Sequence, residues 1–234
     1  MMFQHVITDE KELRRITGEP SKLVNNKVIH HLDENCVQFI KQSPFLTLAT
    51  SDSSGSCDVS PRGDGKGFVH ILNEKYLIIP ERPGNKRVDS MKNLLANPHA
   101  GLIFFIPGLE ETLRVNGKAC IIADEDLLEK MAHKGNVPSL GIAVEVQECF
   151  IHCAKAFKRS GLWDPGTWLA KEERPSAAKM LAEHAKLPDL DEEAVTKRLH
   201  ERTQNDFTER CGEHGFLRIG NRSLEVGRNH GRIY

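Results

Sequence analysis

Residues 100–122, AGLIFFIPGLEETLRVNGKACII, contain two stretches typical of β-strands, 100–106 and 112–122, separated by a short turn-like link. Both are rich in the apolar and β-branched residues that favour strands. Most links between such stretches are short, so the sequence predicts an antiparallel barrel or sandwich and not alternating βαβ units. The other stretches of the same character are 45–51, 57–60, 67–72, 75–80 and 141–150.

Helical patterns accompany these strands. Residues 29–42 place apolar side chains at helical spacing until Ser43-Pro44 ends the pattern. After residue 150 the strand pattern stops, and charged helical patterns follow. The expected helices cover 29–42, 86–96, 124–134, 176–186 and 190–211, with a polar tail after them.

Composition and charge limit the classes of function. The 234 residues are 39% hydrophobic and 28% charged, which is typical of soluble globular proteins. The net charge of −1 gives no global field that would attract nucleic acid or an anionic membrane, so neither is expected as a partner. No apolar run approaches the roughly 20 residues needed to span a bilayer, and the N-terminus lacks the apolar core of a signal peptide. The sequence therefore predicts a cytoplasmic protein in which any anion recognition is local.

Several common catalytic and metal-binding motifs are missing from the sequence. It contains no Gly-x-Gly-x-x-Gly, no Gly-x-x-x-x-Gly-Lys and no Gly-x-Ser-x-Gly, so Rossmann, P-loop and nucleophile-elbow interpretations lack support. The six cysteines form no C-x-x-C pair, and the eleven histidines form no spaced ligand set. We therefore expect structural thiols and no metal site.

Residues 78–98, IIPERPGNKRVDSMKNLLANP, deliver several cations to the start of a predicted helix. If that helix begins near Arg87, the side chains of Lys86, Arg87 and Ser90 share one face at its first turn. Backbone N–H groups there lack partners within the helix, and cations at that end oppose the helix dipole unless an anion is present. The segment is therefore either a phosphate-binding site or a solvated charged turn. Its polar members are Arg82, Asn85, Lys86, Arg87 and Ser90.

Two further polar clusters, SPRGD at 60–64 and LRVNG at 113–117, lie on or beside predicted strands. In the second cluster, Arg114 and Asn116 alternate with apolar residues and share one strand face, which suits a heteroaromatic ring bearing carbonyl oxygens. Each cluster taken alone also fits ordinary solvent-facing residues. Agreement among the three clusters favours a ligand site, with strand candidates Arg62, Gly63, Asp64, Arg114 and Asn116.

Four segments, in order, resemble one known family. They are FLTLATSDSSGSCDVSPRGD (45–64), LIIPERPGNKRVDSMKNLLANPHAGLIFFIPG (77–108), ETLRVNGKACI (111–121) and HCAKAFKRSGLWDPGTW (152–168). Together they resemble the pyridoxamine 5′-phosphate oxidase-like flavoproteins, and most closely the bacterial subgroup with a Pro-Gly-Asn-x-Arg segment. The resemblance covers about residues 30–170.

The resemblance implies a mainly β fold, an antiparallel split β-barrel of the FMN-binding type with helical N- and C-terminal additions. The corresponding segments are an N-terminal extension (1–28), the FMN-binding barrel domain (29–170) and a helical C-terminal extension (171–234). It also implies FMN as cofactor and a homodimer with two flavins at the subunit interface.

The resemblance assigns roles to residues of the motifs. The start of the predicted helix would hold the FMN phosphate, and residues 62–64 would lie along the isoalloxazine ring. Arg114 and Asn116 would approach the ring from the neighbouring strand or from the other subunit. The implied FMN-binding residues are Arg62, Gly63, Asp64, Arg82, Asn85, Lys86, Arg87, Ser90, Arg114 and Asn116.

A last group, from the closing motif, would cover the flavin or shape a substrate pocket. The same residues also suit a helix surface with an aromatic plug at one barrel end. They are Lys155, Arg159, Trp163 and Trp168.

The function expected from the resemblance is an FMN-dependent oxidoreductase acting on an unidentified small molecule. The substrate-binding C-terminal segment of true pyridoxamine phosphate oxidases is not recognisable here, so pyridoxamine phosphate is a doubtful substrate. Two alternatives stay open: a flavin-binding or sensing module without turnover, and a relative that uses haem or deazaflavin on the same fold. No side chain is singled out as a catalytic acid or base.

Overall fold

The computed structural model describes residues 2–208. The chain forms two compact units, Met1–Trp168 and Leu169–Tyr234. The first unit contains every strand described below, and the second contains two α-helices. Among the described residues, no helix is long and apolar enough to cross a membrane.

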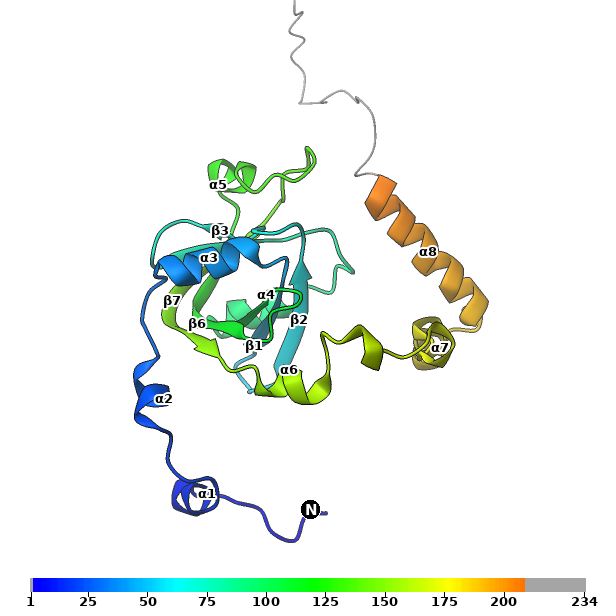
Figure 1. The fold of residues 1–234 in the computed structure, drawn as a ribbon. Coiled ribbons are helices and arrows are strands. Elements are labelled where there is room, and N and C mark those ends of the chain that lie inside the picture. Colours follow the sequence, from blue (N-terminus) through cyan, green and yellow to red (C-terminus); the bar gives the residue numbers. More distant parts are fainter. Residues whose placement is uncertain (1, 209–234) are drawn as a thin grey trace, which may run out of the picture. The chain divides into compact units, whose positions relative to one another are not determined.

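The first unit is built on one antiparallel sheet of seven strands in the order β2-β1-β5-β6-β7-β4-β3. Figure 1 shows these strands curving around a common interior, with helix α3 along one side. The mainly β, antiparallel fold predicted from the sequence is therefore confirmed. The strands are β1 (Phe45–Ser51), β2 (Cys57–Gly63), β3 (His70–Ile71), β4 (Tyr76–Pro80), β5 (His99–Phe105), β6 (Thr112–Ile122) and β7 (Gly141–His152).

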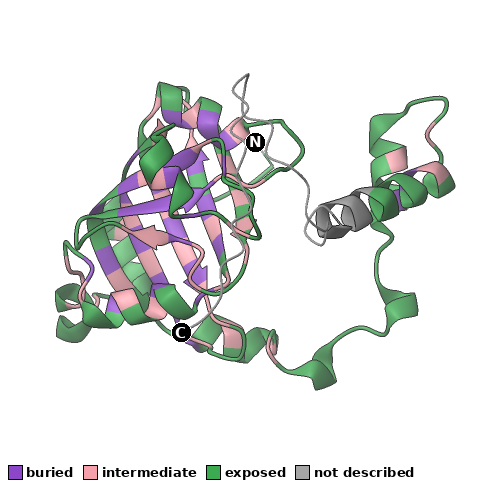
Figure 2. Ribbon diagram, turned by 90° about the horizontal axis from the view of Figure 1, so that it is seen from above, coloured by how far each residue is buried: buried purple, intermediate pink, exposed green. Residues whose placement is uncertain are grey.

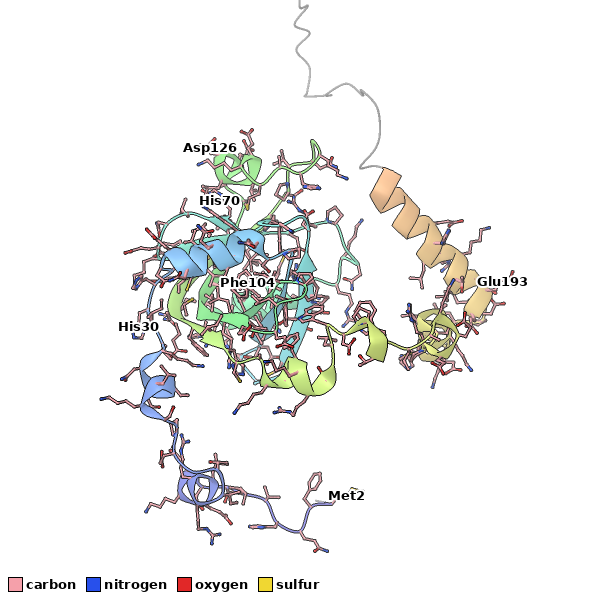
Figure 3. The ribbon with its side chains drawn as sticks, in the orientation of Figure 1. Met2, His30, His70, Phe104, Asp126 and Glu193 are labelled. Atoms are coloured by element: carbon pink, nitrogen blue, oxygen red, sulfur yellow. The ribbon has the colours of Figure 1, made fainter. Side chains whose placement is uncertain are left out.

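Alternating side chains fill the interior of the barrel. Leu46 and Leu48 of β1, Leu102 and Phe104 of β5 and Val115 of β6 are all fully buried. Figure 2 shows buried residues alternating with more exposed ones along the strands, and Phe104 lies among the interior side chains in Figure 3. This period of two is the pattern expected of a sheet with one buried face.

A bulge in the ladder between β6 and β7 requires a glycine. The register shifts between Asn116, which lies opposite Glu148, and Gly117, which lies opposite Val146. A Cβ atom at Gly117 would lie 1.9 Å from the carbonyl oxygen of Glu145, so no other residue fits without moving the backbone.

A helix lies within each predicted range, but the boundaries differ, and the helices Glu10–Thr17, Lys22–Asn26 and Lys155–Ser160 lie outside those ranges. The predicted helix over 29–42 begins only at Glu34, because Ile29 forms an isolated bridge with Cys149 of β7 and Asp33 caps the helix by accepting from the N–H of Cys36. The helices are α1 (Glu10–Thr17), α2 (Lys22–Asn26), α3 (Glu34–Gln42), α4 (Asp89–Ala96), α5 (Glu125–Glu129), α6 (Lys155–Ser160), α7 (Ala177–Ala185) and α8 (Glu192–Thr208), with 3₁₀ turns at Pro165–Thr167 and Lys171–Glu173.

The C-terminal unit contains α7 and α8. Ser176 caps α7 and donates to Glu192 at the start of α8 at 2.6 Å, and Ala178 and Val195 are buried. The last part of the predicted helix over 190–211 and the predicted polar tail lie outside the described residues.

Candidate cofactor and substrate site

Ion pairs near the end of the edge strand β2 join it to the residues that follow β4. No ladder connects β2 with β3, so the barrel is split there in the part of the chain that the structure describes. Arg62 of β2 pairs with Glu81, and Arg82 donates from Nε to Asp64 Oδ2 at 2.7 Å. Residues 81 and 82 directly follow β4, so these pairs hold the end of β4 against the end of β2. Both arginines are thus fixed at the split of the barrel.

His133 belongs to the same cluster and was not predicted from the sequence. Its Nε2 lies 3.5 Å from Asp64 Oδ1, and the Asp64 side chain is only 7% exposed. Arg82 also donates from Nη2 to the carbonyl oxygen of Met131 at 2.9 Å. This hydrogen bond holds the turn that contains Met131 and His133 close to residues 62–64. His133 is far from residue 64 in the chain, and no motif or periodicity links the two.

Ser90 lies in a partly buried hydrogen-bond chain. Its hydroxyl donates to Asp58 Oδ2 at 2.9 Å and lies 2.9 Å from the hydroxyl of Ser60, which accepts from Nε of Arg62 at 3.3 Å. Ser90 is 2% exposed. The structure therefore connects Ser90 to Arg62, with the Asp58 carboxylate at the end of the chain.

The basic segment 82–88 is a loop that precedes α4. The helix begins at Asp89 instead of 86, so Lys86 and Arg87 lie before the first turn and do not share a helix face with Ser90. Lys86 and Val88 have positive φ angles of 60° and 54°, which is unusual for any residue with a side chain and particularly for a β-branched one. Such backbone strain is common at ligand-binding sites.

The start of α4 has no side-chain cap. Val88 at the N-cap position has a side chain that cannot accept a hydrogen bond, and none is found there. The Arg87 side chain is 73% exposed and donates from Nε to Asp89 Oδ2 at 2.7 Å; this hydrogen bond raises the pKa of Arg87, which stays cationic. Asn85 accepts from the N–H of Arg87 at 3.0 Å. Uncapped N–H groups beside exposed cations are a suitable environment for a phosphate, although Asp89 is the present partner of Arg87.

Arg62 and Arg114 lie on opposite faces of the sheet. Arg62 is paired with Leu46, Leu46 with Phe104, and Phe104 with Leu113, so these four side chains share the interior face. Arg114 follows Leu113 in the strand and therefore points to the outer face. Within one chain, the structure does not bring Arg62 together with Arg114 or Asn116.

On that outer face, Arg114 lies beside an aromatic ring. Its Cζ is 5.2 Å from the centroid of Phe150 in β7, and its Nε is buried without a hydrogen-bond partner. Asn116 donates from Nδ2 to Glu148 Oε2 at 3.0 Å. Thus the side-chain amide of Asn116 is hydrogen-bonded to a carboxylate, whereas one N–H donor of Arg114 has no partner.

The four predicted pocket residues lie on α6 and the turn that follows it. Trp163 donates from Nε1 to the carbonyl oxygen of Leu109 at 2.9 Å and stacks on Phe157, with ring centroids 5.7 Å apart. Phe157 contacts Phe105 of β5 at 5.9 Å between centroids, so α6 covers part of the outer face. Lys155, Arg159 and Trp168 are exposed, and Trp168 donates to the carbonyl oxygen of Leu162 at 3.1 Å.

The buried cysteines have structural positions. Cys36 and Cys149 are buried with their sulfur atoms 3.2 Å apart, and the hydrogen bond with Cys36 together with burial raises the pKa of the Cys149 thiol. Within residues 2–208, no group of three or more His, Cys, Asp or Glu side chains could hold a metal ion.

The family profile described as pyridoxamine 5′-phosphate oxidase matches residues 32–153 of the chain. A search of curated protein sequences gave no match. Among solved structures, HupZ from Group A Streptococcus is 17% identical, with a TM-score of 0.43 over 51% of this chain and 92% of that one. A putative pyridoxamine 5′-phosphate oxidase from Lactobacillus delbrueckii is 22% identical, with a TM-score of 0.42 over 52% and 95% of the two chains. An FMN-binding protein from Syntrophomonas wolfei is 11% identical, with a TM-score of 0.39 over 61% and 93%.

Proposed function

Because the chain belongs to the pyridoxamine 5′-phosphate oxidase family, whose profile matches more than half of its length, we propose that it is a cytoplasmic FMN-dependent oxidoreductase acting on a small molecule. The observation that carries the proposal is the segment from Arg82 to Ser90. There, exposed cations, a strained backbone and an uncapped helix start lie together.

The residues present fit the phosphate of FMN. The free N–H groups at the start of α4 and the side chains of Lys86 and Arg87 are complementary to a phosphate dianion. Arg87 would exchange its hydrogen bond with Asp89 for the phosphate. Arg82 and Ser90 act as supports in this proposal, because each is already held by a carboxylate, Asp64 or Asp58.

The residues proposed to contact the flavin ring require a second copy of the chain. Arg62, Gly63 and Asp64 lie at the split of the barrel, whereas Arg114 and Asn116 lie on the outer face. One chain cannot present both groups to one ring, but two copies can, if the outer face of one lies against the split of the other. We therefore include a homodimer with flavin at the interface in the proposal.

Bound FMN supplies hydride or electron transfer, and the protein supplies position and electrostatics. Arg62 and Arg114 are the cations proposed to stabilise negative charge on the reduced ring. His133 is the titratable side chain beside residues 62–64 that is proposed to carry a proton there. Asp64 fixes its position, and Arg82 in turn holds Asp64.

Absorbance and anaerobic reduction test this function. The purified chain supplied with FMN should show a bound-flavin band near 450 nm, as flavins in general do. NADH or NADPH should bleach that band under anaerobic conditions, and an added electron acceptor should restore it. A Soret band without flavin would favour haem, and bound flavin that no donor reduces would favour a non-catalytic flavin-binding module.

A further inference from the structure

A second cation lies beside Arg114 on the outer face. Lys27 lies just before the barrel, and its Nζ is 5.1 Å from the centroid of the Phe150 ring, whose other cationic neighbour is Arg114 at 5.2 Å. Lys27 also donates to the carbonyl oxygen of Ile151 at 2.9 Å. Ile29 fixes this segment, because it exchanges two backbone hydrogen bonds with Cys149, of 3.0 and 2.7 Å. Lys27 is therefore held at the sheet rather than free in solvent.

His152 completes the cluster. It follows Phe150 by two residues in β7 and lies opposite Thr112 of β6, so it shares the outer face with Phe150 and Arg114. Partial burial, and then the positive charges of Lys27 and Arg114, lower the pKa of His152. The charged groups that act on this imidazole are thus cations from the N-terminal segment and from β6.

No acid neutralises these cations in the part of the chain that the structure describes. None of the ion pairs there includes Lys27 or Arg114. On this face of β7, the carboxylate of Glu148 accepts from Asn116. Lys27 and Arg114 lie beside the same aromatic ring, and their like charges repel each other. The buried Nε of Arg114 also lacks an acceptor. An anion beside the ring would offset the repulsion between the two cations.

We propose that Lys27, Arg114 and His152 form a subsite for an anionic group of the substrate, a phosphate or a carboxylate, beside the Phe150 ring. The inference rests on the proposed function, in which Arg114 contacts the flavin, and it adds the substrate's charge. Lys27 gives the anion a point charge, Arg114 the charge of its guanidinium, and His152 an imidazole N–H. The substrate class is therefore a small anionic molecule.

The subsite can be tested on the full-length chain by NMR titration of the histidine side chains, with inorganic phosphate and acetate as probes. A bound anion offsets the two cations, so one or both probes should raise the pKa of His152 saturably while leaving exposed His5 without a saturable shift. A saturable shift with phosphate alone, or with acetate alone, identifies which anionic group the subsite binds. No saturable shift of His152 with either probe overturns the proposal.

A pair of lysine variants tests whether the charge of Lys27 contributes to binding of the anion. Lys27→Gln keeps a donor for the Ile151 carbonyl oxygen and should weaken the probe's binding about tenfold, the effect of losing a charge-assisted contact. Lys22→Gln, in the exposed α2 of the same segment, should leave it unchanged. Equal weakening in both variants contradicts the assignment. FMN binding by the wild type is measured separately. A wild type that does not bind FMN would refute the proposed function, whereas the anion titration of the flavin-free protein still decides the subsite.

Discussion

Arg87 is the residue on which the proposed phosphate recognition depends most directly. It is exposed, lies directly before the uncapped start of α4, and has Asp89 as its partner. We predict that Arg87→Ala raises the Kd for FMN about tenfold to a hundredfold, because a charge-assisted hydrogen bond to the phosphate is lost. Flavin fluorescence quenching on titration measures this directly.

The matched control is Arg15→Ala. Arg15 is 77% exposed and pairs with Glu12 on α1, so it shares Arg87's exposure and pairing but lies on another element. Its removal should leave FMN affinity unchanged. An unchanged Kd in Arg87→Ala would remove Arg87 from the phosphate site.

Gly117 is a position in the sheet that does not accommodate a side chain. We predict that Gly117→Ala destabilises the fold by about 2 kcal/mol or more, because its Cβ would collide with the backbone of Glu145 and not with a flexible side chain. Urea denaturation measures the loss. Gly84→Ala is the control, since its nearest neighbour would be 3.8 Å away and its φ is not in the left-handed region; it should be neutral or slightly stabilising.

At the residue scale, the sequence predicts the candidate side chains but not their partners. The basic segment and Arg114 are visible as local patterns. The hydrogen bonds from Ser90 to Asp58, from Arg82 to Asp64 and from Arg62 to Glu81 join segments that only the fold brings together, and His133 enters the site from a separate turn. The contacts of the predicted site residues with FMN stay predictions.

Helix α3 provides a test at the scale of an element. Asp33 accepts from the N–H of Cys36 at 2.8 Å, and this hydrogen bond lowers the pKa of Asp33. Asp33→Ala should cost about 0.5–2 kcal/mol at pH 7, the usual range for an N-cap. Asp33→Asn should retain most of the stability because asparagine also caps helices.

The pH dependence of this cap follows from the lowered pKa. A depressed carboxylate pKa stabilises the fold above the unfolded value of about 3.9, and the contribution disappears as the pH falls through the lower folded value. The stability difference between wild type and Asp33→Asn should therefore shrink as the pH falls from 7 to 3. A difference that grows toward pH 3 would exclude this role of Asp33.

Element boundaries were predictable where local pattern decides them. The ranges 45–51 and 112–122 coincide with β1 and β6, because alternation with the core defines both strands. The strand predicted over 67–72 shrinks to His70–Ile71, because Gly67 has a φ of +71° and lies against the backbone of Lys41. The first turn of the helix predicted over 29–42 is lost to the bridge between Ile29 and Cys149, which no local pattern reveals.

At the scale of the whole molecule, the two groups of proposed flavin contacts predict self-association. Light scattering of the FMN-loaded protein should give twice the mass of one chain. Val59 of β2 is 63% exposed on the outer face, so Val59→Glu should weaken both association and FMN binding. Val137→Glu, at a 49% exposed loop position, is the control. A monomer that binds flavin fully would contradict the shared site.

The split barrel and its family were accessible from sequence because four motifs occur in order, and the observed sheet and the family match confirm both. The face of the barrel that would meet a partner chain was not accessible, since the sequence does not tell which face of a strand lies outside. That Arg62 and Arg114 lie on opposite faces of the sheet is seen only from the pairing register of the strands from β2 to β6.

Calorimetric titration of the flavin-free protein with FMN, and in parallel with riboflavin, tests the central claim most directly. The two ligands share the ring and differ in the phosphate that the segment 82–90 is proposed to hold. FMN should bind at least about a hundredfold more tightly than riboflavin, because the phosphate contacts are charge-assisted. Equal affinities, or no binding of FMN, would contradict the account.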